Sequence, residues 1–207
     1  MVEYTKSVRI PADRVGVLLG KSRSVLSELE RRTNTKISVD KSGLVTVRGD
    51  AENMQDIYKA IDVIKAIGRG FSPHKAFKLL EEGFELRVIS IRDYAHTKNR
   101  KRIIRGRLIG RGGLARTTIE NMTNTFISVY GDTVSIIGKI PEIDIAEQAV
   151  MEIILGRKHT TVFRNLNDAI MRLRTIEEDF FEHDAYKMAP VDESVERAIR
   201  DLEEEGF

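Results

Sequence analysis

The segment LIGRGGLARTTIENMTNTFISV, residues 108–129, joins a glycine-rich turn to a helix-like run and then to a strand-like run. Ninety positions earlier, residues 18–39 read LLGKSRSVLSELERRTNTKISV. The two segments share their frame and the letters TNTxISV, so we interpret the chain as a duplication. The copies differ at the turn itself, where the second copy has three glycines and the first keeps only Gly20.

Both copies predict the same order of elements, β-α-α-β-β-α, which is an α+β fold. Alternating apolar residues mark a first strand at 3–10 and at 85–94. A short helix follows at about 12–19 and at about 99–109, and the glycine turn separates it from a second helix. Two strands across a tight turn and an amphipathic helix complete each copy.

We expect four consecutive parts in the chain. The first domain covers residues 1–69, and a helical connector covers 70–83. The second domain covers 84–158, and a helical extension with an acidic tail covers 159–207. Within that tail we expect a separate short helix at about 193–204.

Composition argues against several classes of protein. There is no cysteine, hence no disulfide framework and no thiolate zinc site. Neither a membrane-length apolar run nor a signal peptide is present, so we expect a soluble cytoplasmic protein that engages no membrane. The four histidines are scattered, and the acids and histidine of 177–184 are interpreted as a solvated helix end. We therefore expect no enzyme, no cofactor and no metal site.

Charge is unevenly distributed in a chain whose net charge is only +2. Between Tyr94 and Ile119 there are eight Lys or Arg and no acid, whereas residues 175–207 hold twelve acids and three bases. Such asymmetry favours a polyanion-binding face around the second glycine turn, although a solvated helix face is the alternative. The basic candidates are Lys101, Arg102, Arg105, Arg107, Arg111 and Arg116.

The second glycine turn has the features of a phosphate-binding turn. Gly110, Gly112 and Gly113 let a ligand approach the backbone, and the following helix directs free N–H groups and its positive dipole end outward. Arg111, between the glycines, adds a cation. A dinucleotide-binding motif needs a preceding strand, and GVLLGKS at 16–22 is one residue too short for a Walker loop. A turn that merely joins two helices remains the structural alternative.

The helix–GxxG–helix arrangement resembles the KH domain of the β-α-α-β-β-α type (type I), whose GxxG loop clamps about four nucleotides of single-stranded nucleic acid. The run IPADRVGVLLGKS, residues 10–22, is similar to the usual KH pattern I-P-x-x-x-V-G-x-L-I-G-K-x-G except at its last glycine. The resemblance covers both copies.

In such a domain the bases would lie in a groove between the two short helices and the strand after TNT. Ile109, Leu114, Ile127 and Val129 are expected to form its apolar floor, with main-chain groups from Phe126 to Ser128 reading base edges. Each of these apolar residues is also a candidate for the ordinary core.

Arg23 occupies the position in the first copy that corresponds to Gly113. Its long side chain enters the space through which a phosphate would approach the backbone. We therefore expect the first domain to have lost the nucleotide clamp and to serve as a scaffold or a protein-docking module. Functional drift without a new role is the alternative.

A degenerate KH domain followed by an intact one resembles the partner-of-Nob (Dim) family of small-subunit ribosome assembly factors. The segments GRLIGRGG and TNTFISVYGDTVSIIG are the most similar parts. The resemblance implies binding of single-stranded RNA at the 3′ end of small-subunit ribosomal RNA, work beside a Nob-type endonuclease on the small ribosomal subunit, and contact with a translation initiation factor. The lack of a long polar N-terminal extension favours an archaeal, cytoplasmic form. The alternative is a KH adaptor of another ribosome-assembly complex or of an RNA-degradation complex.

Overall fold

The structure, a computed structural model, describes the backbone of residues 3–188 and the side chains of residues 3–176. The chain divides into two compact units, of which the first ends at Ile170 and the second begins at Met171. The short helix expected at 193–204 lies outside the described residues, and so do the side chains of 177–184.

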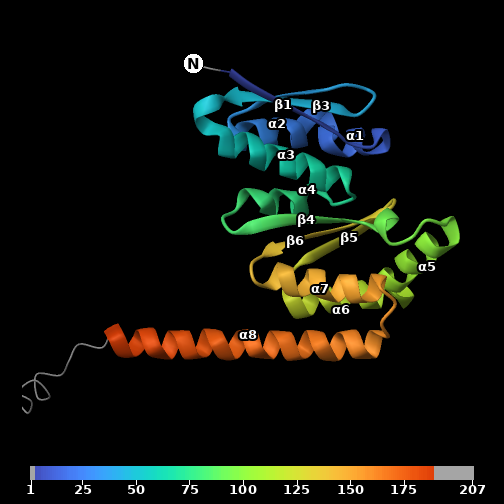
Figure 1. Ribbon diagram of the computed structural model, residues 1–207. Coiled ribbons are helices and arrows are strands. Elements are labelled where there is room, and N and C mark those ends of the chain that lie inside the picture. Colours follow the sequence, from blue (N-terminus) through green and yellow to red (C-terminus); the bar gives the residue numbers. More distant parts are fainter. Residues whose placement is uncertain (1–2, 189–207) are drawn as a thin grey trace, which may run out of the picture. The chain divides into compact units, whose positions relative to one another are not determined.

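The first domain has the expected order of elements (Figure 1). Its strands are β1 (Glu3–Arg9), β2 (Lys36–Val39) and β3 (Leu44–Asp50), and its helices are α1 (Ala12–Leu19), α2 (Ser24–Thr33) and α3 (Met54–Gly68). A 3-10 turn, η1 (Lys21–Arg23), separates α1 from α2, and another, η2 (Ala51–Asn53), precedes α3. The strands form an antiparallel sheet in the order β1-β3-β2, with the helices on one face.

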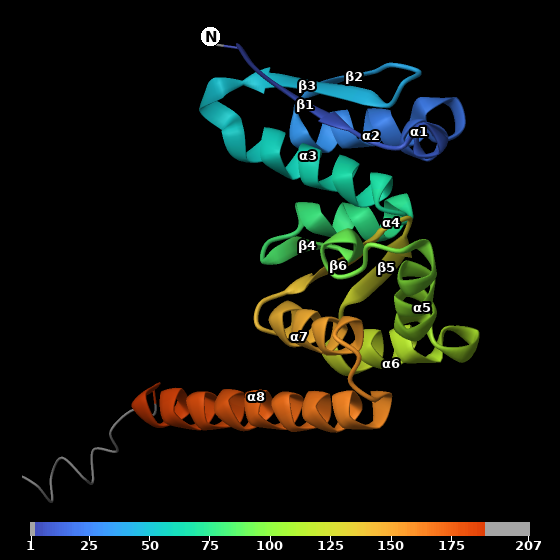
Figure 2. The same ribbon diagram turned by 45° about the vertical axis from the view of Figure 1, so that its right-hand side comes forward.

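The second domain repeats this architecture (Figure 2). Its strands are β4 (Phe84–Ser90), β5 (Phe126–Tyr130) and β6 (Thr133–Lys139), and its helices are α5 (Lys98–Ile109), α6 (Leu114–Thr123) and α7 (Glu142–Ile154). The short turns are η4 (Ile91–Asp93) and η5 (Arg111–Gly113). The sheet has the order β4-β6-β5 and is antiparallel throughout. The predicted α+β fold with two copies of β-α-α-β-β-α is confirmed.

The repeated TNT motif ends the second helix of each copy. Asn124 caps α6 in the left-handed conformation, with φ 50° and ψ 38°, and Asn34 does the same for α2. Asparagine tolerates this conformation better than most residues. The hydroxyls of Thr123 and Thr125, both buried, bond to each other at 2.8 Å. The motif is therefore a helix stop that turns the chain directly into β5.

A packed connector joins the two domains. It consists of α4 (Pro73–Ala76) and the 3-10 turn η3 (Phe77–Leu80). The core of the first domain and connector includes Ile137 of β6, and Phe84, Leu86 and Phe126 of the second sheet pack against it. Because successive strand side chains point to opposite faces, the second sheet is covered on one face by α3 and the connector and on the other by its own helices.

The last helix, α8 (His159–Met188), begins inside the first compact unit. Val162, Leu166 and Ile170 are buried in the core of the second domain, which also contains residues of α7. This contact explains why the first unit extends to Ile170. The domain boundaries expected at 69, 83 and 158 stay predictions.

Candidate nucleic-acid interface

The two glycine turns follow nearly the same backbone path. Gly110 has φ 74° and ψ 175°, and Gly20 has φ 70° and ψ 179°. Gly113 lies in the left-handed region at φ 85°. The first copy reaches the same region with two non-glycine residues, Ser22 at φ 52° and Arg23 at φ 63°. Since this conformation costs an L-residue about 1–2 kcal/mol, the first turn is strained where the second is not.

The glycines of the second turn serve different structural purposes: one allows close packing, and two leave open space. A Cβ atom on Gly110 would lie 2.7 Å from both the nitrogen and the Cβ of Ala115, so this glycine allows α6 to pack closely against the turn. A Cβ on Gly112 would meet nothing within 4 Å, and one on Gly113 would meet only the tip of Arg116 at 3.9 Å. The open space for a ligand therefore lies over Gly112 and Gly113.

The backbone at this turn presents donors to that space. Among the described residues, the N–H groups of Arg111 and Gly112 have no hydrogen-bond acceptor. The ten-residue helix α6 begins at Leu114, immediately after the turn. Its first N–H groups and its positive dipole end face the same space, which is an arrangement that binds phosphate oxygens.

Gly106 belongs to the same surface, and the sequence analysis did not select it. It lies one helical turn before Gly110 on α5, and a Cβ there would meet nothing within 4 Å. Gly16 has the same position and the same open surroundings in α1. A glycine inside a helix is less stable than alanine by about 0.5–1 kcal/mol. The repeat offset of ninety positions, which joins Gly16 to Gly106, was the signal that could have identified it.

The expected apolar floor of the groove divides into two groups. Leu114, next to the turn, is 67% exposed, and Ile109 is 38% exposed. Both are therefore accessible to a ligand. Ile127 is only 4% exposed and belongs to the core of the second domain.

The side chains of Phe126 and Ser128 lie on the other face of β5, toward the first domain. Phe126 packs against the core of that domain. Ser128 is buried, and its hydroxyl donates a hydrogen bond to the carbonyl of Arg69 at 2.8 Å. Neither side chain therefore faces the groove beside the glycine turn.

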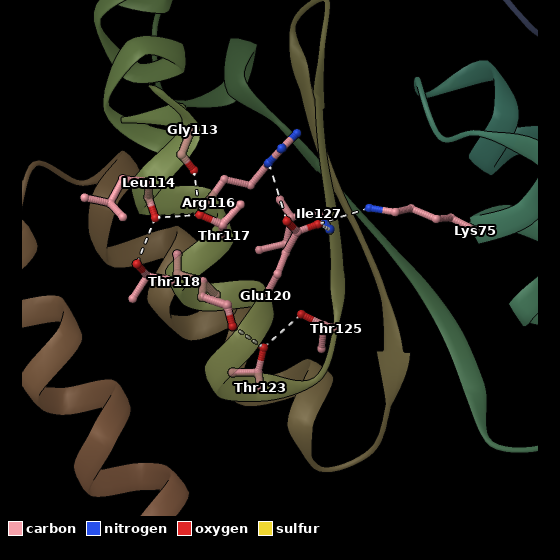
Figure 3. A network of polar contacts seen from close by, with 11 residues as sticks. Lys75, Gly113, Leu114, Arg116, Thr117, Thr118, Glu120, Thr123, Thr125 and Ile127 are labelled. Carbon is pink, nitrogen blue, oxygen red and sulfur yellow. Dashed lines mark hydrogen bonds and ion pairs between the residues drawn. The ribbon is translucent and has the colours of Figure 1, made fainter. Parts of the chain in front are cut away.

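Glu120 occupies part of the exposed edge of β5 (Figure 3). Its Oε1 atom accepts a hydrogen bond of 2.7 Å from the N–H of Ile127, and Glu30 does the same for Ile37 in the first copy. Outward-facing groups alternate along an edge strand. The main-chain groups left for a base are thus the carbonyl of Ile127 and both the N–H and the carbonyl of Val129.

Arg107 has a structural role at the end of α7. Its guanidinium donates to the carbonyl of Ile153 at 2.9 Å and also to the carbonyl of Arg157. The C-terminal carbonyls of a helix lack partners within the helix. Arg107 adds a donor to one of them, the carbonyl of Ile153, which also accepts from the N–H of Gly156. Its guanidinium is held between this carbonyl and that of Arg157 and is therefore not free to bind a phosphate.

Lys101 and Arg105 attach α5 to the turn between β5 and β6. Lys101 donates to the carboxylate of Asp132 at 2.9 Å, and Arg105 donates to the carbonyl of Gly131 at 3.0 Å. The hydrogen bonds from Lys101 and then from Arg92 lower the pKa of the Asp132 carboxyl below its ordinary value. The charge of Lys101 is thus partly compensated at the place where the sequence predicted a binding cation.

The remaining predicted cations are more available. Arg102 is exposed, and within the described part of the chain its one side-chain hydrogen bond is to Asn99 on its own helix, at 3.2 Å. Arg111 is exposed on the turn and has no side-chain partner among the described residues. Arg116 is half-buried, with its Nε 3.5 Å from the Oε2 of Glu120. The structure thus brings Arg111, Arg116 and the open glycines together.

The described part of the chain shows neither a cluster of three or more metal-ligating side chains nor a helix long and apolar enough to cross a membrane.

Two copies of a three-stranded antiparallel sheet with three helices, the second with a helix–GxxG–helix turn, define a tandem KH protein. Family models agree with this assignment. A KH domain matches residues 5–66, and the second Pno1 domain, a eukaryotic-type KH domain of type I, matches residues 85–171.

A KH domain-containing protein of Methanocaldococcus jannaschii is 36% identical over 199 residues, which are 95% of this chain and 86% of that protein. The pre-rRNA-processing protein pno1 of Aspergillus fumigatus is 31% identical over 121 residues, or 57% of this chain. The chain spans about half the length of that eukaryotic relative, 48%. A solved complex of a/eIF2alpha, aDim2p and rRNA from Pyrococcus horikoshii contains a chain with a TM-score of 0.76 and 40% identity, covering 82% of this chain and 96% of that one. The chain belongs to the Pno1/Dim2 family of tandem KH proteins.

Proposed function

We propose that the protein binds single-stranded RNA at the 3′ end of small-subunit ribosomal RNA through its second KH domain, and that it acts in small-subunit assembly and rRNA maturation. The open turn carries this proposal. The second turn combines two glycines with open space above them, Gly112 and Gly113, with Arg111, whose side chain has no partner among the described residues. The first copy has Ser22 and Arg23 in place of these glycines. The names of the relatives support the nature of the target, because one is a pre-rRNA-processing protein and another was solved with rRNA.

The bases would lie against Gly106, Ile109 and Leu114, which are exposed beside the turn. A helical glycine without a nearby side chain leaves room for a flat base against the helix backbone. An aliphatic groove also suits a chain with few aromatic residues, since it does not rely on stacking platforms of the kind that β-sheet RNA-binding domains use.

We further propose that the first domain serves as a scaffold or a protein-docking module. The contacts of β5 support the scaffold role. The Ser128 hydroxyl bonds to Arg69, and the hydroxyl of Tyr130 donates to the carboxylate of Asp13. The strand that borders the RNA groove is thus attached to the first domain from behind.

The partners proposed for this chain are a Nob-type endonuclease, the small ribosomal subunit and a translation initiation factor, in the cytoplasm. The initiation factor has the most direct support, since a/eIF2alpha is present in the solved complex of a similar chain. A KH adaptor of another ribosome-assembly or RNA-degradation complex remains the competing function.

The RNA target is tested by crosslinking in cells followed by sequencing of the bound RNA. We expect reads concentrated at the 3′ end of small-subunit rRNA. Reads spread over messenger RNA, with none at that end, would contradict the proposed target and favour the adaptor.

The binding site is tested by a charge-matched pair of variants. Gly113→Asp places a carboxylate where the phosphate would approach, whereas Ser22→Asp adds the same charge to the first turn, at a residue that already has a positive φ. Since like charges at an interface cost several kcal/mol, we expect Gly113→Asp to reduce RNA affinity by at least about tenfold and Ser22→Asp to change it little. Equal losses from both variants would contradict the assignment to the second turn.

A further inference from the structure

A second concave site lies at the far end of α6 from the glycine turn. It has a volume of about 300 Å³ and lies where α6 ends and β5 begins, next to the connector helix α4. Its lining residues are Lys75, Glu120, Asn121, Asn124, Thr125 and Phe126. None of them except Phe126 was a candidate in the sequence, and Lys75 comes from outside the second domain.

The pocket and the glycine turn lie on one side of the same helix. Gly113, Arg116, Glu120 and Asn124 are spaced by three or four positions, which places them on one face of α6. Ten helical residues span about 15 Å. Figure 3 shows Arg116, from the same helix, and Lys75, from the connector on the other side of the strand, both directed at Glu120. A strand bound at the turn can therefore continue along this face to the pocket.

The side chains of the pocket match the parts of a nucleotide. The Nζ atom of Lys75 lies 5.0 Å from the ring centre of Phe126 and 3.7 Å from Oε1 of Glu120, and this side chain is 39% exposed. Lysine is a common phosphate-binding residue. Asn121 and Asn124 are exposed, and among the described residues their amides have no side-chain partner. Each amide offers a donor and an acceptor, the combination that pairs with the edge of a base.

The first copy lacks this combination. Its counterpart of Asn121 is Arg31, which is paired with Glu28 at 2.7 Å, and its counterpart of Phe126 is Lys36. A cavity that includes the equivalents of Glu120 and Phe126, Glu30 and Lys36, is otherwise lined by Glu3, Ile37, Ser38 and Arg48, and by no amide or aromatic side chain. The two copies thus share the asparagine at the helix end, Asn34 and Asn124, but only the second copy combines it with Asn121, Phe126 and the open turn.

We propose that this pocket holds one additional nucleotide of the single-stranded RNA whose backbone lies on the glycine turn. Lys75 contacts its phosphate, and the amides of Asn121 and Asn124 contact its base. This inference rests on RNA binding by the second domain. It gives the connector a direct contact with RNA and extends the bound strand beyond the clamp.

The test measures how RNA affinity depends on RNA length, in proteins with and without the side chains of the pocket. The probes are nested single-stranded RNAs from the 3′ end of small-subunit rRNA, shortened from either end, from about four to about eight nucleotides, because a KH clamp holds about four. The proteins are the full chain, Lys75→Ala/Asn121→Ala, and Lys78→Ala as a control. Lys78 belongs to the same connector, carries the same charge, pairs with Glu81 and does not line the pocket.

We expect the wild-type protein and Lys78→Ala to gain about tenfold in affinity at one step of the series, as is typical for one added nucleotide contact. The pocket variant should lose that step and keep the affinity of the wild type for the shortest RNA. An unchanged step in the pocket variant, the same loss in Lys78→Ala, or no step in the wild type would each overturn the pocket. Gly113→Asp distinguishes the proposed RNA clamp at the glycine turn from the proposed pocket. Full RNA binding by that variant would contradict the clamp, independently of the result for the pocket variant.

Discussion

Glu120 connects α6 to the edge of β5 by accepting a hydrogen bond of 2.7 Å from the N–H of Ile127. The side chain of Glu120 is only 11% exposed, with Lys75 at 3.7 Å and Arg116 at 3.5 Å. One nearly buried carboxylate therefore joins a helix, a strand and the connector. It also determines which main-chain groups of β5 remain available to a ligand.

Two substitutions of Glu120 should distinguish the contribution of its hydrogen bond to stability from the contribution of its charge. We expect Glu120→Ala to lower the free energy of unfolding by about 1–3 kcal/mol, because the Ile127 N–H loses its partner. Glu120→Gln keeps an acceptor and should cost less. Urea unfolding of both variants measures the difference, and equal losses would show that the ion pairs with Lys75 and Arg116 dominate instead.

Alanine at the two open helical glycines should distinguish stability from binding. Gly106→Ala and Gly16→Ala each fill empty space, so both should raise the free energy of unfolding by about 0.5–1 kcal/mol. Only Gly106→Ala should weaken RNA binding, because its methyl group occupies the place proposed for a base. Thermal unfolding and a binding titration of each variant provide the two readouts. Unchanged RNA affinity in Gly106→Ala would remove Gly106 from the interface.

Arg23→Gly should restore the open turn of the first domain. Relief of the left-handed strain is worth about 1–2 kcal/mol, and the added flexibility of the unfolded chain offsets about half of it. We expect a net gain in stability of about 0.5–1 kcal/mol, the strain less this offset. In a Gly113→Asp background, weak RNA binding should reappear. If stability rises and no binding returns, the Arg23 side chain is not what closed the first clamp.

Gly70 and Gly83 provide a matched test of the contact between the domains. Both have positive φ, 96° and 79°, so alanine is strained at either position. A Cβ on Gly70 would also lie 2.7 Å from the Ser128 hydroxyl, whereas one on Gly83 would meet only Lys139 at 3.8 Å. We expect Gly70→Ala to be less stable than Gly83→Ala by about 1–3 kcal/mol, the usual effect of overpacking. Equal stabilities of the two variants would mean that the contact between the domains adjusts to the added methyl group at little energetic cost.

Asp132→Asn should strengthen RNA binding several-fold at low salt. The change removes a negative charge next to the interface and weakens the hydrogen bonds that hold Lys101 and Arg92, because a neutral amide oxygen is a poorer acceptor than a carboxylate. The gain should shrink as salt screens the charges. Titrations at two salt concentrations measure it, and a gain that persists at high salt would point to a rearranged turn instead.

The free energy of unfolding should depend on pH through Asp132, and the direction of this dependence follows from its pKa. Because the pKa of Asp132 is lowered from its ordinary 3.8, the carboxylate stabilises the fold above that pH and loses this effect as the pH falls through the lowered pKa. The difference in unfolding free energy between the wild-type protein and Asp132→Asn should thus be constant from about pH 5 to pH 8. A change within that range would mean that another group titrates.

The sequence by itself determined the order of the elements and the position of the turn. Apolar periodicity, glycine at the turn and the TNT helix stop act within a few residues of where they occur, and the repeat shows each of them twice. The pairing of β2 with β3 and of β5 with β6 follows from the same local signals, since both hairpins close across short turns.

The tertiary structure decided which of the predicted residues are free to bind. Arg107 meets the carbonyl of Ile153, 46 positions later, and Lys101 meets Asp132, 31 positions later. Glu120 covers an edge N–H, and the connector brings Lys75 to the end of α6. A side chain's availability depends on neighbours that only folding brings together. Local pattern can therefore locate a binding turn, but it cannot show which cations around that turn already have partners.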